Sequence, residues 1–508
     1  MPTRSSLRVR TDNPYNTREV EEAAVGRLVC VSNRISLPKR GVSPGGLAVG
    51  LLSALQHTGG LWFGWSGETT DRPGSEPTLS GRGNVRFATI DLDTRDFDAF
   101  YNGFCNSTLW PLFHYFAAGF RHEQREYEAY LRVNARFAQQ LVKMLRPDDA
   151  VWVHDYQLIP LGRQLRELRF QGRIGFFLHI PFPHLQVLRE LPGYAELVRD
   201  LCQYELVGFQ TDDDLRSFLS CLDVPDGFRL PGSGRVEVRG RNLKLGVYPI
   251  GIDVEEVIAE ARESIHQESV QRMVASLQGR KLIIGVDRLD YSKGLTQRFA
   301  AFEHFLETFP DNQGNVTFLQ IAPLSRSDVL AYSEIRRTLE QAAGRINGRF
   351  AEADWTPIRY LNRNFSRATL AGFMRSAQVA LVTPVRDGMN LVAKEFVAAQ
   401  DPDDPGVLIL SPLAGAAREL SGALQVNPYD KRGMALALQE ALSMPLEQRR
   451  SRHEQMLAAV RRHDIHNWYS RFVFDLTGQR INKPTAQPEG GNVRLLEHSA
   501  HTRSGFRA

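Results

Sequence analysis

The stretch Arg288-Leu289-Asp290-Tyr291-Ser292-Lys293-Gly294-Leu295 directly follows the apolar run KLIIGV at residues 281–286. A strand that ends near Arg288 and turns through a short polar segment brings Lys293 back to the same point. Gly294 lets the backbone approach closely, and a helix is expected to begin just beyond it. Two convergent cations beside the start of a helix form a site for a diphosphate. The stretch therefore predicts a phosphate-binding edge on an α/β sheet.

A second cluster of the same kind lies about a hundred residues further along the chain. It reads TPVRDGMNLVAKE at residues 383–395, follows the apolar run VALV at 379–382, and again opens a predicted helix. Either cluster alone is equally compatible with an ordinary strand–loop–helix turn that carries surface charge. The pair of clusters favours a shared binding site.

Short apolar runs alternate with amphipathic stretches throughout the chain. The runs are too short for helices and too uniformly apolar for half-exposed strands, so they indicate parallel sheets covered on both faces. The predicted fold class is α/β, with two doubly wound, Rossmann-like domains that face each other across a cleft. The runs lie at residues 28–31, 85–90, 150–153, 174–178, 206–209, 245–248, 282–286, 316–321, 358–361, 379–382, 407–410 and 423–426.

The domain boundary is predicted at residues 248/249. The N-terminal domain then covers residues 27–248 and the C-terminal domain residues 249–481, whose last helix can cross back to the first domain. The polar tails at residues 1–26 and 482–508 are expected to be disordered. Because polar motifs directly follow most of the runs, they are expected to converge on one edge of each sheet, with the two edges forming the cleft.

Composition narrows the class of protein further. The chain has 508 residues, 42% of them hydrophobic and 24% charged, with a net charge of +4, so nucleic acid is not an implied partner. No apolar run reaches the length of a membrane span, and the N-terminus lacks the apolar core of a secretion signal. The cysteines, Cys30, Cys105, Cys202 and Cys221, form no CxxC pair, which favours free thiols in a reducing cytoplasm.

A series of long motifs resembles the trehalose-6-phosphate synthase family, glycosyltransferase family 20. The resemblance extends from about residue 27 to residue 480. The motifs are VSNR (31–34), PGGLAVGL (44–51), LWFGWSG (61–67), FYNGFCNSTLWP (100–111), VWVHDYQL (151–158), FFLHIPFP (176–183), GFQT (208–211), VYPIGID (247–253), DRLDYSKGL (287–295) and TPVRDGMNLVAKEF (383–396).

The resemblance implies a GT-B architecture and a retaining transfer of glucose from a nucleotide-glucose to glucose 6-phosphate, giving α,α-trehalose 6-phosphate. It also implies a homodimer or homotetramer, and a separate phosphatase that receives the product. The base of the donor stays open between uracil, adenine and guanine, because the phosphate and ribose contacts are common to all three.

For the donor, the resemblance implies that Arg288 and Lys293 hold the diphosphate, where each preorganised cation is worth roughly 3–4 kcal/mol on the developing charge. Asp387 would bind hydroxyls of the transferred glucose, and Glu395 the ribose hydroxyls. The other implied donor residues are Gly45 and Gly46 in a loop opposite, Phe365 near the base, and the helix-opening residues Leu391, Val392, Ala393 and Lys394. A tight turn at Gly45-Gly46 and core packing of Phe365 are the alternative explanations.

For the acceptor, Arg34 and Arg326 are expected to grip one phosphate from opposite domains, because a dianion suits forked donors. Tyr101 would add a hydroxyl, and Asp155 would bind an acceptor hydroxyl near the chemistry. His179 is expected to position the sugar through its backbone at a strand end and to stabilise charge in an oxocarbenium-like transition state.

Trp65 and Trp110 would supply apolar faces for the sugars, and Trp110 matches the family position linked to the choice of acceptor anomer. A tryptophan in an α/β protein is often simply part of the core. Trp110 lies in NSTLWP, however, which is expected to form a loop.

No metal or other cofactor is predicted. Asp212-Asp213-Asp214 is the one acidic triplet that resembles a metal motif, and it is expected to cap a helix instead. Two alternatives stay open: a related synthase with another phosphorylated acceptor, and a catalytically silent regulatory subunit of a trehalose-synthesising complex. A silent subunit should have lost Arg288, Lys293, Asp387 or Glu395, and all four are present.

Overall fold

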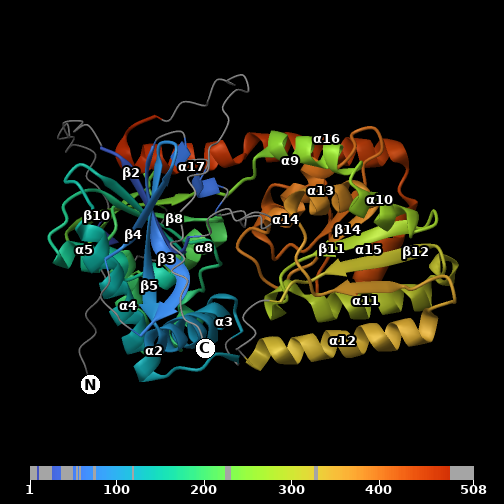
Figure 1. Cartoon of the computed structure of the whole chain (residues 1–508), viewed down its shortest axis with the longest axis horizontal. Coiled ribbons are helices and arrows are strands. Elements are labelled where there is room, and N and C mark those ends of the chain that lie inside the picture. The colour runs from blue at the N-terminus through green and yellow to red at the C-terminus, as the bar shows by residue number, and fades with distance from the viewer. Residues whose placement is uncertain are drawn as a thin grey trace, which may run out of the picture.

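Two separate β-sheets organise the chain (Figure 1). The computed structural model describes residues 9–10, 26–35, 48, 50–52, 55–56, 59–71, 76–116, 119–222, 230–324 and 330–480. The first sheet has the strand order β1-β9-β10-β8-β7-β6-β2-β3-β5-β4, and the second the order β13-β12-β11-β14-β15-β16. The predicted boundary at residues 248/249 falls between the two sheets, after β10 and before β11.

The N-terminal sheet is parallel at its centre and antiparallel at its edges. Strands β4 and β5 pair antiparallel at one edge, and β9 pairs antiparallel with both β10 and β1 at the other. The prediction of parallel pairing is wrong at these edges, because short hairpins add strands that need no crossover helix. The strands are β1 Val9–Arg10, β2 Leu28–Arg34, β3 Gly60–Thr70, β4 Thr78–Arg82, β5 Val85–Asp93, β6 Ala150–His154, β7 Ile174–Phe177, β8 Leu206–Phe209, β9 Arg235–Val238 and β10 Arg241–Val247.

Four strands of this sheet, β1, β3, β4 and β9, lie outside the predicted apolar runs. β1 lies inside the segment 1–26 that was predicted to be disordered, and it pairs with Glu237 and Val238 because backbone pairing does not require an apolar sequence. β3 is central, between β2 and β5, although three glycines interrupt its apolar pattern. The predicted C-terminal tail at residues 482–508 lies outside the described residues.

The segment NSTLWP is helical rather than a loop. It belongs to the π-helix η1, Asp98–Leu109, which runs directly into α3, Trp110–Phe113. The prediction failed because two polar side chains of the segment have hydrogen-bond partners within the fold: Ser107 Oγ donates to Asn102 O (2.7 Å) and Thr108 Oγ1 to Arg121 O (2.5 Å). The other helices of this domain are α2 Thr94–Phe97, α4 Gln124–Val142, η3 Tyr156–Leu158, α5 Leu161–Glu167, α6 Leu185–Leu188, α7 Tyr194–Leu201 and α8 Asp212–Leu219.

The C-terminal sheet is parallel throughout. Its strands are β11 Lys281–Val286, β12 Val316–Ile321, β13 Ile358–Leu361, β14 Val379–Val382, β15 Val407–Leu410 and β16 Leu424–Gln425. The helices are α9 Val254–Ser264, α10 Glu268–Ala275, η4 Tyr291–Lys293, α11 Leu295–Thr308, η5 Pro310–Asn312, α12 Leu330–Phe350, α13 Arg367–Arg375, α14 Leu391–Ala399, η6 Gly415–Arg418, α15 Lys431–Ser443, α16 Leu446–Arg462 and α17 Ile465–Thr477.

Both faces of each sheet are covered. In β2, Val29 and Val31 belong to one apolar cluster while Leu28 and Cys30 belong to another on the opposite face. In β11, Ile283 lies in a cluster distinct from that of its neighbours Leu282 and Ile284. This arrangement explains why the runs are uniformly apolar. Among the described residues, no helix is both long and apolar enough to span a membrane.

The last helix joins the two domains. Figure 1 shows α16 beside the C-terminal domain and α17 continuing over the N-terminal sheet. The rings of Trp468 and Phe472 in α17 lie 4.9 Å and 4.6 Å from that of Trp152 in β6. Arg173 at the start of β7 donates to Leu476 O (2.9 Å), so α17 is tied to the N-terminal sheet by polar as well as apolar contacts.

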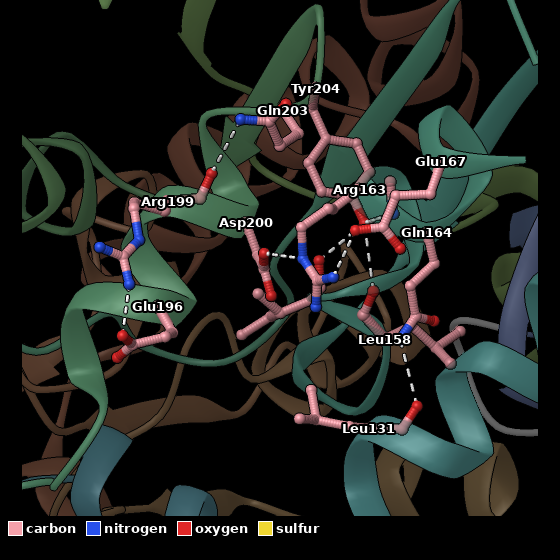
Figure 2. A network of polar contacts seen from close by, with 12 residues as sticks. Leu131, Leu158, Arg163, Gln164, Glu167, Glu196, Arg199, Asp200, Gln203 and Tyr204 are labelled. Atoms are coloured by element: carbon pink, nitrogen blue, oxygen red, sulfur yellow. Dashed lines mark hydrogen bonds and ion pairs between the residues drawn. The ribbon is translucent and has the colours of Figure 1, made fainter. Parts of the chain in front are cut away.

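A polar network fixes the loop after β6 (Figure 2). Tyr204 Oη donates to the carbonyl oxygens of Leu158 (3.1 Å) and Ile159 (3.0 Å), and Arg163 Nε donates to Asp200 Oδ1 (2.6 Å). Burial raises the pKa of Asp200 to about 6, and Arg163 opposes that rise. The network holds α5 against α7 and thereby anchors the residues that follow Asp155.

Candidate active site

The two clusters that end β11 and β14 lie against each other. The backbone N–H of Val385 donates to Ser292 O (2.9 Å), and that of Arg386 to the same oxygen (3.3 Å). Gly294 has a left-handed φ of +68°, and a Cβ there would lie 2.2 Å from Thr383 O, so no other residue fits without displacing the neighbouring loop. The prediction that both clusters form one site is therefore supported by direct backbone contact.

The two clusters place a cation and a carboxylate side by side. Lys293 Nζ lies 2.5 Å from Asp387 Oδ2, and Asn390 Nδ2 donates to the same oxygen (3.0 Å). Both members of the ion pair are largely buried, with side-chain exposures of 11% for Lys293 and 14% for Asp387. A ligand phosphate arriving here can take up N–H donors of Lys293, and sugar hydroxyls can donate to Asp387.

Arg288 is exposed at the end of β11 and faces the other domain. Its guanidinium lies 5.7 Å from the ring centre of Trp110 in α3, so it forms a cation–π contact across the cleft. Within the described part of the chain it has no carboxylate partner, which leaves its hydrogen-bond donors available to an anion. Trp110 also approaches Tyr156, next to Asp155, with 5.8 Å between the ring centres.

Arg298 in α11 donates hydrogen bonds to residues of both clusters, and no motif in the sequence predicted this role. The side chain is fully buried and donates to Asp287 Oδ2 (2.8 Å), Gln320 Oε1 (2.8 Å), Lys293 O (3.2 Å) and Thr383 Oγ1 (3.3 Å). A signal was present: Arg298 shares the apolar helix face of Leu295 and Phe302, where a charge requires buried partners.

The start of α14 presents backbone donors toward the same region. Asn390 caps the helix in a left-handed conformation, its Oδ1 accepting from the Ala393 N–H (3.3 Å), and Leu391 and Val392 are only partly buried. Lys394 points away from the clusters, donating through Nζ to Ile250 O (2.8 Å) and pairing with Glu419 (2.8 Å). Only its backbone can therefore take the predicted role in donor binding.

Glu395 and Phe365 are the residues predicted to lie near the nucleoside of the donor. Burial raises the pKa of Glu395, and the charge of Arg367 at the start of α13 opposes that rise. Phe365 is half-buried against Phe373, with ring centres 5.4 Å apart, and under the guanidinium of Arg363 at 4.5 Å. Gly45, Gly46 and Arg326, also predicted to bind substrates, lie outside the described residues.

Arg34 is exposed at the end of β2, and its guanidinium lies over the ring of Trp65. Its guanidinium lies 5.4 Å from the ring centre of Trp65, whose ring is 6.2 Å from that of Tyr101. A Cβ on Gly67 would come within 2.6 Å of Arg34 Nη2, so the glycine leaves room for the guanidinium. Trp65 is itself buried and supports Arg34 from beneath, while the forked donors of Arg34 remain exposed.

Asp155, directly after β6, has a strained backbone. Its φ of +75° and ψ of 166° fall in a region that is normally restricted to glycine, and such outliers gather at functional sites. Hydrogen bonds to the residues that follow Asp155 hold the loop in this conformation: Tyr130 Oη donates to Tyr156 O (2.8 Å) and Asn134 Nδ2 to Gln157 O (3.0 Å). Asp155 Oδ1 also accepts from the His179 N–H (3.2 Å), which joins two predicted site residues.

His179 contributes its backbone to the domain contact. A Cβ on Gly388 would lie 2.1 Å from His179 O, so the donor loop touches this strand end directly. The His179 ring shares a hydrogen bond with His154 (Nε2 to Nδ1, 3.1 Å), and burial lowers its pKa to about 3. The imidazole is therefore neutral at physiological pH.

Within the described residues, no three His, Cys, Asp or Glu side chains gather in a group that could hold a metal ion. The acidic triplet forms the first turn of α8, and the prediction that it caps the helix is wrong, because the N-cap is Thr211, whose Oγ1 accepts from the Asp214 N–H (3.2 Å). Asp214 Oδ1 accepts from the Phe182 N–H (2.9 Å), and Asp213 pairs with Arg216 (2.7 Å) and with Arg418 of the other domain. These carboxylates thus have structural partners.

Acid should lower the free energy of unfolding of the protein through His114. This residue is 2% exposed and lies next to the candidate active site. Burial lowers its pKa to about 4, with Lys293 acting in the same direction and Asp290, Trp110 O and Asp387 opposing. Between pH 6.5 and 4 the unfolded chain therefore binds more protons than the folded one, so stability falls as the pH falls. At pH 5 we expect a loss of about 2 kcal/mol relative to pH 7.5 from this group.

Urea unfolding at pH 7.5 and pH 5 measures this effect. The control is His114→Asn, which does not titrate and whose Nδ2 can replace the hydrogen bond between His114 Nδ1 and Trp110 O (2.8 Å). The variant should lose less stability between the two pH values than the parent. Identical losses in both proteins would contradict the assignment.

Two facing α/β domains, with paired polar clusters at the strand ends of one and the strained Asp155 loop on the other, have the arrangement of a GT-B glycosyltransferase. The sequence comparison is more specific: the model of glycosyltransferase family 20 matches residues 32–478. The chain belongs to glycosyltransferase family 20.

Curated relatives and solved structures agree with this membership. A trehalose-6-phosphate synthase from Klebsiella pneumoniae is 50% identical over 453 residues, covering 89% of this chain and 95% of the relative. A UDP-forming α,α-trehalose-phosphate synthase from Burkholderia xenovorans, in complex with glucose-6-phosphate, is 51% identical with a TM-score of 0.86, covering 89% and 100%. An E. coli structure bound with UDP-2-fluoro glucose is 46% identical with a TM-score of 0.84, covering 89% and 99%.

Proposed function

We propose that this chain is a trehalose-6-phosphate synthase that transfers glucose from a nucleotide-glucose to glucose 6-phosphate with retention of configuration. The observation that carries the proposal is the contact between the two clusters. It puts Lys293 and Asp387 together and leaves Arg288 facing Trp110 across the cleft. Relatives about half identical to the chain carry the same activity in their names.

On the donor side, Arg288 and Lys293 bind the diphosphate and stabilise the charge that develops on it when the glucosyl bond breaks. When Lys293 turns to the diphosphate, the Asp387 carboxylate accepts hydrogen bonds from hydroxyls of the transferred glucose instead. The N–H groups at the start of α14 complete the phosphate site. UDP-glucose is the preferred donor in this proposal, because the related Burkholderia enzyme is UDP-forming.

On the acceptor side, Arg34 and Tyr101 bind the phosphate of glucose 6-phosphate, and Arg326 joins them from the other domain. Asp155 accepts a hydrogen bond from an acceptor hydroxyl, and Trp110 shapes the space beside the anomeric carbon. The anomeric hydroxyl oxygen of the acceptor bonds to C1 of the donor glucose. The bond between C1 and the leaving phosphate breaks on the same face, and that phosphate takes the acceptor proton. His179 contributes its carbonyl group to sugar positioning and no proton, which its neutral, hydrogen-bonded ring supports.

Further parts of the proposal concern the setting of the enzyme. No metal or other cofactor takes part, and the cations Arg288 and Lys293 balance the charge of the diphosphate instead. The four cysteines are buried free thiols, which supports a cytoplasmic location. A homodimer or homotetramer is the proposed assembly, and a phosphatase that removes phosphate from trehalose 6-phosphate is the proposed consumer of the product.

One experiment tests the function: initial rates in excess EDTA with UDP-, ADP- and GDP-glucose, each with glucose 6-phosphate, glucose or glycerol phosphate. We expect rapid formation of trehalose 6-phosphate with glucose 6-phosphate and little product with the other acceptors. Preference for glycerol phosphate would support the related synthase, and no transfer from any donor would support the regulatory subunit. Loss of activity in EDTA, restored by magnesium or manganese, would refute the metal-free mechanism.

Replacing Arg34 with alanine should raise the KM for glucose 6-phosphate by roughly ten- to a hundredfold, because charge-assisted hydrogen bonds to the phosphate are lost. Equilibrium binding of UDP should stay at the parental level. Arg34→Lys keeps the charge without the fork and should be intermediate. Adding Arg326→Ala should have a less than additive effect, because both side chains share one ligand. A collapse of donor binding with acceptor binding intact would show that Arg34 serves the donor.

A further inference from the structure

The segment of residues 110–116, here called the aromatic segment, joins the N-terminal domain to both donor clusters. Trp110 lies under Arg288, as described above. Phe116 packs edge-on against Tyr291, with 5.0 Å between ring centres, and Tyr115 lies under the guanidinium of Arg386 at 4.2 Å from its ring centre. One short segment thus makes three contacts with the loops that end β11 and β14.

Tyr115 is the conformational outlier of this segment. Its φ is +64°, a left-handed value that a bulky side chain rarely adopts. Local bonds hold it there: the Tyr115 N–H donates to Leu112 O (3.0 Å), the Phe116 N–H donates to Pro111 O (2.8 Å), and Tyr115 Oη accepts from the His184 N–H (3.0 Å). Backbone strain that is overdetermined in this way points to a functional constraint on the ring.

Arg386 is the partner of that ring and precedes Asp387 directly. The residue is half-buried, and its Nε is buried with no hydrogen-bond partner in the described parts of the chain, so the face of Tyr115 is the contact that covers this side of the guanidinium. A cation–π contact becomes stronger where the cation is partly removed from water. The backbone of Arg386 meets Ser292 O (3.3 Å), and Asp387 pairs with Lys293. Immobilising the Arg386 side chain therefore restrains the residues that hold the ion pair.

We propose that Tyr115 is a positioning residue for the transfer reaction: its ring clamps Arg386 across the cleft and holds the donor loop, residues 383–395, in the geometry needed for turnover. The inference rests on the proposed function for the role of that loop. Tyr115 acts through Arg386 and touches no substrate.

The test compares Tyr115→Asn, Tyr115→Phe and the control Tyr429→Asn, which removes a tyrosine that is 63% exposed on the C-terminal domain. Asparagine adopts left-handed backbone readily, so Tyr115→Asn keeps the turn but loses the ring and the hydroxyl that accepts from the His184 N–H, whereas Tyr115→Phe loses the hydroxyl alone. We expect Tyr115→Asn to lower kcat by about five- to thirtyfold, the value of a partly desolvated cation–π contact, while equilibrium affinity for UDP stays parental. Tyr115→Phe and the control should keep the parental kcat.

A double-mutant cycle with Arg386→Met completes the test. The two kcat losses should be less than multiplicative, because both changes break one contact. Four outcomes would each overturn the proposal. They are kcat losses that multiply in the double variant, a parental kcat in Tyr115→Asn, a kcat loss in Tyr115→Phe equal to that in Tyr115→Asn, and a loss of UDP affinity that parallels the loss of kcat.

Hydrogen–deuterium exchange separates this inference from the proposed function, because it needs no activity. Peptides covering residues 383–395 should exchange faster in Tyr115→Asn than in the parent, and exchange in Tyr429→Asn should be unchanged. If the parent transfers no glucose, the proposed function fails and exchange alone decides the inference. Unchanged exchange in that loop would overturn the clamp even in a fully active enzyme.

Discussion

Replacing Arg288 or Lys293 with alanine should lower kcat by roughly two to three orders of magnitude while the protein stays folded. Arg288 is exposed and contacts Trp110 only through the face of the ring, so its donors are free to meet the leaving phosphate. Lys293 is held by Asp387 and can transfer its donors to that phosphate. Both cations act most strongly where charge develops, so the loss should appear in kcat more than in KM.

Rates at saturating donor and acceptor, together with circular dichroism and thermal melting, measure this effect. Arg336→Ala is a matched control, because Arg336 forms an exposed pair with Glu340 (2.7 Å) on α12, away from both clusters. Arg288→Lys should recover part of the activity, since charge is kept and the fork is lost. An alanine variant that melts like the parent and keeps more than half of its activity would refute the role of that cation.

Replacing Arg298 with methionine should destabilise the C-terminal domain by about 3–5 kcal/mol, the usual cost of breaking a buried ion pair. The change leaves Asp287 buried beside Gln320 without its cation, and it removes the donors to Lys293 O and Thr383 Oγ1. Because these acceptors lie in both clusters, variant protein that still folds should also lose activity.

Chemical unfolding followed by tryptophan fluorescence tests the prediction for Arg298. In the double variant Asp287→Asn/Arg298→Met the buried carboxylate is neutralised as well, so the combined loss should be smaller than the sum of the single losses. The control Arg345→Met removes an arginine of α12 that is largely exposed and pairs with Glu303. A loss in Arg298→Met no larger than in this control would contradict the supporting role.

Much of the fold was predictable because uniformly apolar runs and their spacing report buried parallel strands. The strand β3 was not predicted, because its glycines interrupt the apolar run and its pairing depends on the neighbouring strands β2 and β5. The helical state of NSTLWP was not predicted for a related reason. Ser107 and Thr108 donate hydrogen bonds to the carbonyl oxygens of Asn102 and Arg121, and local helix propensity does not report such contacts.

The candidate site was predictable where a residue type implies its chemistry. Arg288, Lys293 and Asp387 follow strand ends, and the ends of parallel strands meet at one edge of a sheet. Lys394 belongs to the same motif but points to Ile250 and Glu419, because the helix turns its side chain away from the cleft. Membership in a motif therefore predicts the position of a backbone better than the direction of a side chain.

The sequence by itself determined the two-domain α/β class, the positions of the donor clusters and the family, because strand periodicity and long motifs are local properties of the chain. Only the tertiary structure decided which side chains meet. The contact between Ser292 and Val385, the support from Arg298, the strained backbone of Asp155 and the clamp of Tyr115 on Arg386 join segments far apart in sequence. Such contacts depend on how the two sheets and their loops pack together, and no local pattern records that packing.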